Sequence, residues 1–327
     1  GRHRYGRRLR RSPDLPGVTI DAALSGITNP MKLIECVPNF SEGKNQQTVE
    51  VLTQAVKKIA GVRLLDASAD ADHNRCVLTL LSPPEEIVDG AMAVAEEALR
   101  WIDMRRHEGI HPRIGAVDVV PFIPLGDATM ADAVTAAHRF GHEFAKRTGV
   151  PVYFYGEAAL KPERRQLPAV RRGGYEGLKA RLKDPQWYPD EGDAVFNDRW
   201  GATAVGARIP LVAFNVNLDS TDLSLAREIA CAIRESSGGF PCVKAIGLFL
   251  AGRKKIQVSM NLTDYRKTSL RTVFDSIEKM ARTRGVSVLY SELIGLSPRD
   301  AFADATPEYL RLIDFSEDRI IESHFQF

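Results

Sequence analysis

Apolar residues recur along most of the chain with one of two periods, and the changes of period mark where strands and helices are expected. Short alternating runs predict strands, whereas the stripe formed by Val49, Leu52, Val56 and Ile59 predicts a helix that is buried on one side. In its first half, the sequence predicts strands at 32–38, 62–68, 75–81, 116–122 and 150–155, and helices at 46–60, 84–102 and 129–148.

The second half of the chain repeats this order. It predicts strands at 211–217, 243–250, 255–261 and 286–291, and helices at 222–235 and 267–284. Two strand-helix-strand-strand-helix-strand units are typical of ferredoxin-like domains, in which helices cover one face of an antiparallel sheet. The expected fold class is therefore α+β with two tandem ferredoxin-like (βαββαβ) subdomains. The paired strands within 62–81 and 243–261 argue against a doubly wound parallel sheet.

One helix start and one long loop complete the predicted organisation. Ser82 can cap the helix at 84–102, Pro83 suits its first turn, and Glu85 would complete a capping box. Residues 156–205 lack clear periodicity apart from a short helix expected near 174–183, which is typical of a functional loop. The basic side chains of this loop could pair with substrate carboxylates or keep the loop solvated, and we favour solvation for Lys161, Arg164, Arg165, Arg171 and Arg172.

Composition narrows the possible classes of protein. The 327 residues are 44% hydrophobic and 26% charged, and no apolar run approaches the roughly 20 residues that cross a bilayer. Residues 1–30 carry six Arg against Asp14 and Asp21, so the formal net charge of +2 becomes about −2 for the rest of the chain. That balance disfavours nucleic-acid binding. We interpret 1–30 as a disordered or artificial extension before a natural start at Met31, with a transit peptide as the alternative.

The cysteines indicate the compartment. Cys36, Cys76, Cys231 and Cys242 lie in apolar segments without CxxC or zinc-type spacing, as expected of thiols in a reducing environment. The sequence therefore predicts a cytoplasmic protein.

Candidate chemistry concentrates in residues 103–116, which hold two His, three Arg and two Gly between a predicted helix and a predicted strand. A neutral imidazole can exchange a proton near pH 7, so His107 or His111 could be a general acid/base, or either could simply be exposed to solvent. Pro112 restricts the backbone of His111, which favours His111 over His107.

Other kinds of site are disfavoured by missing motifs. The spacing of His107 and His111, like that of His138 and His142, could suit a metal, but no HExxH pattern follows, so we expect no metal. We place His138 and His142 on the polar side of their helix. The absence of GxGxxG, GxxxxGK[ST] and GxSxG motifs argues against nucleotide cofactors and serine hydrolysis.

Four segments together resemble the glutamate formiminotransferase family: Ile34–Gly43 (IECVPNFSEG), Arg106–Arg113 (RHEGIHPR), Pro151–Ala158 (PVYFYGEA) and Trp200–Thr203 (WGAT). The resemblance runs from Met31 to about residue 300. It implies two ferredoxin-like subdomains, which we place at 31–209 and 210–327, in a homodimer. It also implies transfer of a formimino group from formiminoglutamate to tetrahydrofolate, a co-substrate, in histidine degradation. The chain ends before a cyclodeaminase domain could begin, as in a monofunctional form.

The resemblance also implies site residues. The family's catalytic acid/base histidine corresponds to His111. The segment that contacts folate in the family corresponds to Gly192, Asp193, Ala194, Val195, Phe196, Asn197, Asp198, Arg199, Trp200 and Gly201. The sequence departs from the mammalian pattern between Ser68 and His73, which bears on substrate orientation.

Substrate chemistry suggests further candidates. Glutamate and folate carry carboxylates, so Arg113 and, second, Arg75 could bind them, although either could form a surface ion pair instead. Asn39 could hydrogen-bond a substrate or merely cap a turn. Trp200 or Phe196 could pack against the pterin or anchor a small core. The alternatives to formimino transfer are formyl transfer between glutamate and folate, and a folate-binding subunit without catalytic activity.

Overall fold

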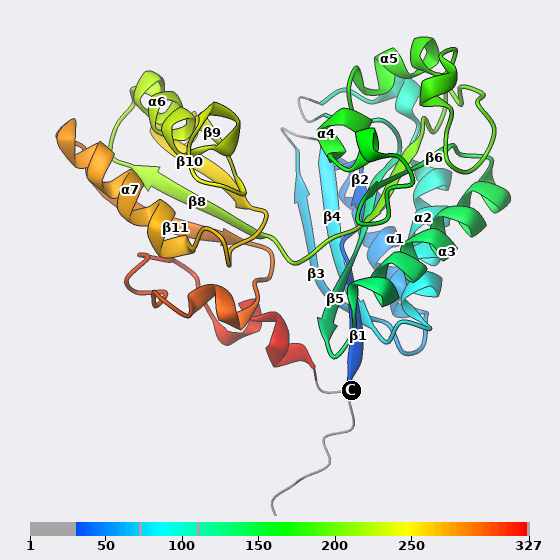
Figure 1. Ribbon diagram of the computed structural model, residues 1–327, viewed down its shortest axis with the longest axis horizontal. Helices are drawn as coiled ribbons and strands as arrows, with labels where there is room; N and C mark the ends of the chain where they lie inside the picture. Colours follow the sequence, from blue (N-terminus) through cyan, green and yellow to red (C-terminus); the bar gives the residue numbers. More distant parts are fainter. Residues whose placement is uncertain (1–30, 72–73, 110–111, 326–327) are drawn as a thin grey trace, which may run out of the picture.

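The computed structural model describes residues 31–71, 74–109 and 112–325. They form two units of mixed helix and strand, each built on its own sheet (Figure 1). The predicted α+β class is thereby confirmed. Within these residues, each helix is too short or too polar to span a bilayer.

The sheet of the first unit has a mainly antiparallel half and a parallel half. Its strands are β1 (Lys32–Cys36), β2 (Asn39–Phe40), β3 (Arg63–Asp70), β4 (Arg75–Ser82), β5 (Val117–Gly126), β6 (Val152–Gly156) and β7 (Thr203–Ala207). β1 and β2 lie end to end between β4 and β5, and β3 is the outer partner of β4. Beyond β5, the strands β7 and β6 follow in parallel.

Three helices cover one face of this sheet: α1 (Gln46–Lys57), α2 (Ile87–Trp101) and α3 (Met130–Thr148) (Figure 1). The alternation along β1 supplies this core with Ile34 and Cys36, and the apolar stripe of α1 contributes Leu52 and Val56. Burial of these faces is what orients β1, so the next residues along the strand must point to the opposite face.

The opposite face of the first sheet is covered only in part. The short helices α4 (Leu167–Val170) and α5 (Gly174–Arg181) pack near β6 and β7 around Tyr153 and Tyr155. At the other end, Leu33 and Ile123 pack with Ile321 from the C-terminal segment. Between these two clusters, part of the sheet stays open.

The second unit is a four-stranded antiparallel sheet in the order β11 (Val288–Ile294), β8 (Val212–Leu218), β10 (Lys255–Leu262), β9 (Val243–Leu250). The helices α6 (Leu223–Ile233) and α7 (Leu270–Thr283) cover one face. Figure 1 shows these helices on the side away from the first unit, so the bare face of the second sheet looks toward the first sheet. The single-turn helices are η1 (Met104–Arg106), η2 (Pro162–Arg164), η3 (Pro185–Trp187), η4 (Glu235–Ser237), η5 (Arg299–Phe302), η6 (Glu317–Arg319) and η7 (Ile321–His324).

The structure corrects three local predictions. The first sheet is not wholly antiparallel, because β7 pairs in parallel with β5. The sequence did not predict β7, since its five residues are small and all buried and so show no alternation. The predicted strand 32–38 ends at Cys36, and a separate short strand begins at Asn39, after Pro38. The capping box at Ser82 was wrong, since Ser82 still belongs to β4 and pairs with Ile34, and α2 starts at Ile87 without a side-chain cap.

Candidate active site

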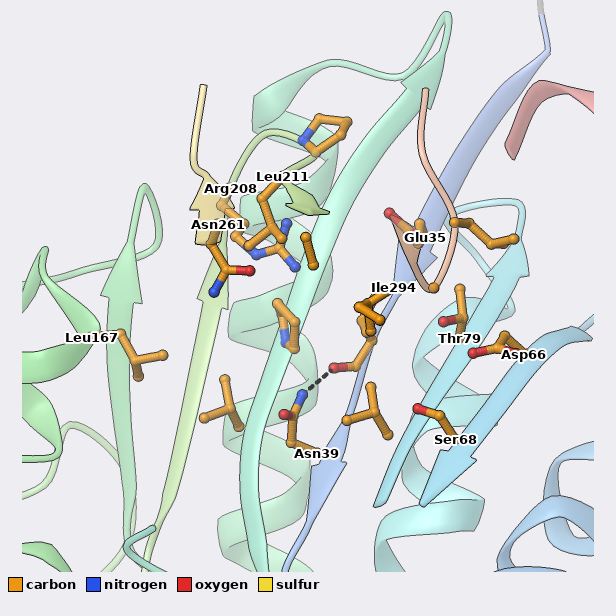
Figure 2. Close-up of a pocket in the computed structure, with 18 of the residues that line it drawn as sticks. Glu35, Asn39, Asp66, Ser68, Thr79, Leu167, Arg208, Leu211, Asn261 and Ile294 are labelled. Atoms are coloured by element: carbon orange, nitrogen blue, oxygen red, sulfur yellow. Dashed lines mark hydrogen bonds between the residues drawn. The ribbon is translucent and has the colours of Figure 1, made fainter. Parts of the chain in front are cut away.

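A cavity of about 310 Å³ lies between the open faces of the two sheets. The first unit lines it with polar and charged side chains that include Arg75 and Glu35. Figure 2 shows Glu35 together with Leu211, Asn261 and Ile294, which the second unit contributes. Binding sites for small molecules commonly fall in clefts of roughly 300–1,000 Å³ where two units meet. This cavity is therefore the best candidate for the active site.

Alternate residues of the first two strands reach the cavity. Glu35, Val37 and Asn39 line it, while Ile34 and Cys36 face the helices, as a period of two requires. The Nδ2 of Asn39 donates a hydrogen bond to the carbonyl oxygen of Val37 at 2.9 Å (Figure 2). The backbone of its own strand therefore orients the amide of Asn39.

Glu35 is a charged residue in the middle of a buried strand. Its side chain is 8% exposed, and burial raises its pKa to about 7, against the opposing effect of Arg208 and with a smaller contribution from Glu322. A carboxyl group in this position changes charge near neutral pH and lies on the cavity wall.

Two guanidinium groups meet at another part of the wall. Arg75 opens β4, and burial together with the charge of Arg171 holds the pKa of Arg75 below its usual range. Arg171 forms an ion pair with Asp118, whose other oxygen accepts a hydrogen bond from the backbone N–H of Ile114 at 2.8 Å. Asp118 and Asp70 offset part of this positive charge, and the guanidinium groups supply N–H donors that suit a carboxylate of a ligand.

The Ile114 contact leads from the cavity to the segment 103–116, where both ring nitrogens of His107 have hydrogen-bond partners. The Nε of Arg113 donates to Nδ1 of His107 at 3.1 Å, and Nε2 of His107 lies 2.9 Å from the carbonyl oxygen of Asn74. Because a guanidinium only donates and a carbonyl only accepts, the imidazole is the neutral tautomer with its proton on Nε2. Both ring nitrogens are engaged, so His107 is a structural residue in this arrangement.

Arg113 is itself paired. Its two terminal nitrogens donate to Glu176 at 3.0 and 2.6 Å, and its side chain is 13% exposed against 63% for Glu176. Arg113 does not line the cavity between the sheets. The predicted catalyst His111 lies outside the described residues.

Close backbone contacts fix the described parts of this segment. Asn74, with a φ of 49°, accepts a hydrogen bond from the N–H of Gly43 at 3.0 Å and donates one to the carbonyl of Glu108 at 2.8 Å. Further along, Gly115 crosses Gly201 so tightly that a Cβ on Gly115 would lie 2.2 Å from a backbone oxygen. Only glycine fits there.

The predicted folate segment Gly192–Gly201 does not line the cavity; its end at Arg199 and Trp200 accepts backbone hydrogen bonds from Met104 and Ala116. Trp200 donates its indole N–H to the carbonyl of Leu99 at 2.8 Å and packs against the helical core. Phe196 packs against Tyr175, with ring centroids 5.6 Å apart. Both aromatic rings thus have protein partners, which is the anchoring role considered from the sequence.

Of the predicted substrate-binding residues, the structure brings Asn39 and Arg75 to the cavity. Sequence reasoning missed Glu35, Arg171 and Arg208. For Glu35 the signal was present, since an acidic residue in a buried strand needs a reason. Solvation was wrong for Arg171 and also for Arg164, which is 1% exposed and pairs with Asp190 at 2.6 Å.

Two further histidines, His138 and His142, lie on α3. His138 does not lie on the polar side of α3 as predicted: it is half-buried, packs on Phe154 and bonds to the carbonyl of Ala158 through Nε2 at 2.8 Å. His142 is exposed and lies 3.1 Å from Glu191. In the part of the chain that the structure describes, no three His, Cys, Asp or Glu side chains are placed to hold a metal ion.

Comparison with known proteins matches the chain to two family profiles. Residues 33–208 match the formiminotransferase domain, N-terminal subdomain, and residues 213–324 match the formiminotransferase domain. The chain is 44% identical to the glutamate formimidoyltransferase of Streptococcus pyogenes serotype M1, covering 90% of this chain and 98% of that protein. It is 41% identical to the Thermoplasma acidophilum glutamate formimidoyltransferase, covering 89% and 97%.

Longer relatives match over part of their length. The chain is 44% identical to the formimidoyltransferase-cyclodeaminase of Gallus gallus, with 86% of the chain matched to 53% of that protein, so it spans about half of such relatives. A solved microcompartment protein from Desulfitobacterium hafniense has a TM-score of 0.21 at 11% identity, which is too low to support an argument.

An α+β protein of two units with a charged cavity between its sheets is the class that the structure defines. The profiles, which together cover almost the whole described chain, identify the family: this chain belongs to the formiminotransferases, as the resemblance of its four motifs indicated.

Proposed function

We propose that this chain transfers the formimino group from N-formimino-L-glutamate to N5 of tetrahydrofolate, giving 5-formiminotetrahydrofolate and glutamate in histidine degradation. One observation carries the proposal: in a chain of this family, the first family motif projects Glu35, Val37 and Asn39 into the cavity between the sheets. Relatives of nearly the same length as this chain are named for this activity.

The reaction moves the formimino carbon together with its imino nitrogen to N5, and one proton passes from N5 to the leaving nitrogen. N5 attacks the formimino carbon, and the bond from that carbon to the glutamate nitrogen then breaks. N5 loses a proton and the leaving nitrogen gains one, so a single group with a pKa near 7 can serve both steps. We assign that acid/base role to His111, the histidine that the family resemblance selects. His107 is unsuited to it, because both of its ring nitrogens are occupied.

The carboxylates of the two substrates need cationic partners. Arg75, beside Arg171 on the cavity wall, is placed to take one, and Asn39 can offer its amide to the same ligand. A carboxylate that reached Arg113 would replace Glu176, whose side chain is largely exposed. We propose that tetrahydrofolate, as co-substrate, contacts Gly192–Gly201, with no metal or nucleotide taking part.

Four finer features belong to the same proposal. The strand orders β11-β8-β10-β9 and, in the first unit, β3-β4-β1-β5 suit two ferredoxin-like subdomains. We place them at 31–209 and 210–327. We also propose a homodimer, as in the family, and a cytoplasmic location, which agrees with four free cysteines.

The test is formation of 5-formiminotetrahydrofolate by the native chain and by His111→Ala. Turnover in the native chain that falls by about 10²-fold or more in the variant would support both the reaction and the assignment. Undiminished turnover in the variant would remove His111 from the mechanism. Absence of turnover with folate binding intact would favour the formyl donor or a non-catalytic folate-binding subunit. An assay with N-formylglutamate as donor would distinguish these two, since only the first would show turnover.

A further inference from the structure

The carboxylate of Glu35 has no partner of its own in the cavity. Its side chain is more than nine-tenths buried and lines the space between the sheets (Figure 2). None of the residues that the structure describes hydrogen-bonds to this carboxylate or forms an ion pair with it, and Arg208 acts on it only through its charge. A buried carboxylate in this state is costly unless a ligand satisfies it.

A purely structural role does not account for Glu35. Within β1 the backbone of Glu35 pairs with Leu81 and Ile123, and that pairing needs no carboxylate. The residue two positions earlier on the same face is Leu33, which packs into an apolar cluster. An apolar residue at position 35 would serve the sheet better, so the acidic group points to a ligand.

The two candidate donors differ in charge at the group that is transferred. A formimino group attached to nitrogen is an amidine, which is a strong base and carries a proton at neutral pH. Its two N–H bonds lie side by side in one plane and match the two oxygens of a carboxylate, as a guanidinium does. A formyl group on the same nitrogen is a neutral amide that presents a carbonyl oxygen, which an ionised carboxylate repels.

We propose that the Glu35 carboxylate binds the protonated formimino group of the donor and thereby selects a formimino donor over a formyl donor. This inference rests on the proposed function and specifies the substrate recognition of the same site. The ion pair holds the amidine in its cationic form, in which the carbon is most open to attack by N5. The proton stays on the formimino nitrogen, and no bond to Glu35 forms or breaks.

Recognition of a cation requires Glu35 to be ionised, so pH becomes a readout. The carboxyl group titrates near pH 7 in the free protein. Binding of formiminoglutamate should therefore improve as the pH rises through about 7. The charged and titratable groups around Glu35 are Arg208, Glu322, Asp66, Tyr155, Arg75, Arg171 and, on the opposite face of the strand, Cys36.

The experiment compares the native chain with Glu35→Gln, which keeps the size and removes the charge, and with Glu322→Gln, which lies outside the cavity wall. For each protein, kcat/KM for formiminoglutamate is measured between pH 5.5 and 9, and N-formylglutamate is measured as a competitive inhibitor. We expect Glu35→Gln to lower kcat/KM about 100-fold, whereas the inhibition constant of N-formylglutamate, whose formyl group is neutral, should stay the same or fall. In Glu322→Gln, loss of a neighbouring negative charge should move the rising limb to lower pH.

The outcomes separate the two proposals. Native protein without formimino transfer would defeat the proposed function itself. If the native chain is active and Glu35→Gln keeps its kcat/KM within about threefold, the role of Glu35 is overturned. It is also overturned if the variant binds formiminoglutamate and N-formylglutamate more weakly by the same factor, because that result indicates a structural defect. A dissociation constant for formiminoglutamate, measured without tetrahydrofolate, that varies with pH in Glu35→Gln as it does in the native chain would also overturn it, because His111 can give kcat/KM a rising limb of its own.

Discussion

At the scale of single residues, the acidic group on the cavity wall is expected to act on stability as well as on recognition. Folding raises the pKa of Glu35 from 4.5 to about 7, so the folded protein binds this proton more tightly than the unfolded chain does. The resulting stability is fully present below pH 4.5 and is lost as the pH rises through about 7. At about 1.4 kcal/mol for each pH unit, the loss is on the order of 3 kcal/mol.

Glu35→Gln should remove this dependence. The quantity of interest is the free energy of unfolding of the variant minus that of the native chain. We expect this difference to be larger at pH 8.5 than at pH 4.5 by a few kcal/mol. Chemical denaturation of both proteins at the two pH values measures the difference. Parallel pH profiles for the native chain and the variant would contradict the raised pKa.

What the sequence could predict about individual residues followed from local pattern. Asn39 and Arg75 stand where strands begin or end, and both reached the cavity wall. The hydrogen bonds of His107 and the ion pair of Arg164 could not be predicted, because each depends on partners far away in the sequence. The carbonyl that fixes His107 belongs to residue 74, and the carboxylate that neutralises Arg164 belongs to residue 190.

At the scale of elements, the tightest feature near the proposed catalytic segment is the crossing of Gly115 and Gly201. A methyl group on Gly115 would lie 2.2 Å from the carbonyl oxygen of Ala202 and 2.5 Å from that of Trp200, so the backbone would have to move. Because Gly115 lies four residues after the proposed catalyst His111 in the sequence, we expect Gly115→Ala to lower kcat at least 10-fold. Steady-state kinetics and thermal unfolding would be measured together.

Gly177 provides a matched control for this substitution. It lies within α5, and a Cβ there would meet no atom within 4 Å. Gly177→Ala should leave kcat unchanged and stabilise the protein by up to about 1 kcal/mol, since alanine favours a helix. Equal activity of Gly115→Ala and Gly177→Ala would show that the crossing does not position the catalytic segment.

The elements themselves were predictable where one face is buried and the other is not. The stripe of α1 and the strand β9 follow directly from such alternation, and β9 was placed at its observed bounds. The sequence did not predict β7, because a strand that is buried on both faces has no alternation of polar and apolar positions. The start of α2 was misplaced because the extension of β4 through Ser82 is set by its partner β1, which a local pattern does not reveal.

At the scale of the whole molecule, the C-terminal segment links the two units. After β11 its Leu312 bridges to Ser291 of that strand, Ile320 bridges back to Ser297, and the segment then reaches the first unit. There Arg63 donates to the carbonyl oxygen of His324 at 2.6 Å, and Ile321 packs with Leu33. The sequence after residue 295 has little periodicity, so this connection could not be predicted.

Ile321 is both part of that link and part of the cavity wall, since it is 2% exposed and lines the space between the sheets. Ile321→Ala should therefore destabilise the protein by about 2–5 kcal/mol and also raise KM for the substrates, because the wall that holds the units together is loosened. The control is Ile313→Ala in the same segment, where the side chain is 40% exposed and the expected cost is below about 1 kcal/mol. Thermal unfolding and steady-state kinetics test both effects. A stability loss without any change in KM would mean that the C-terminal segment stabilises the first unit but does not shape the cavity.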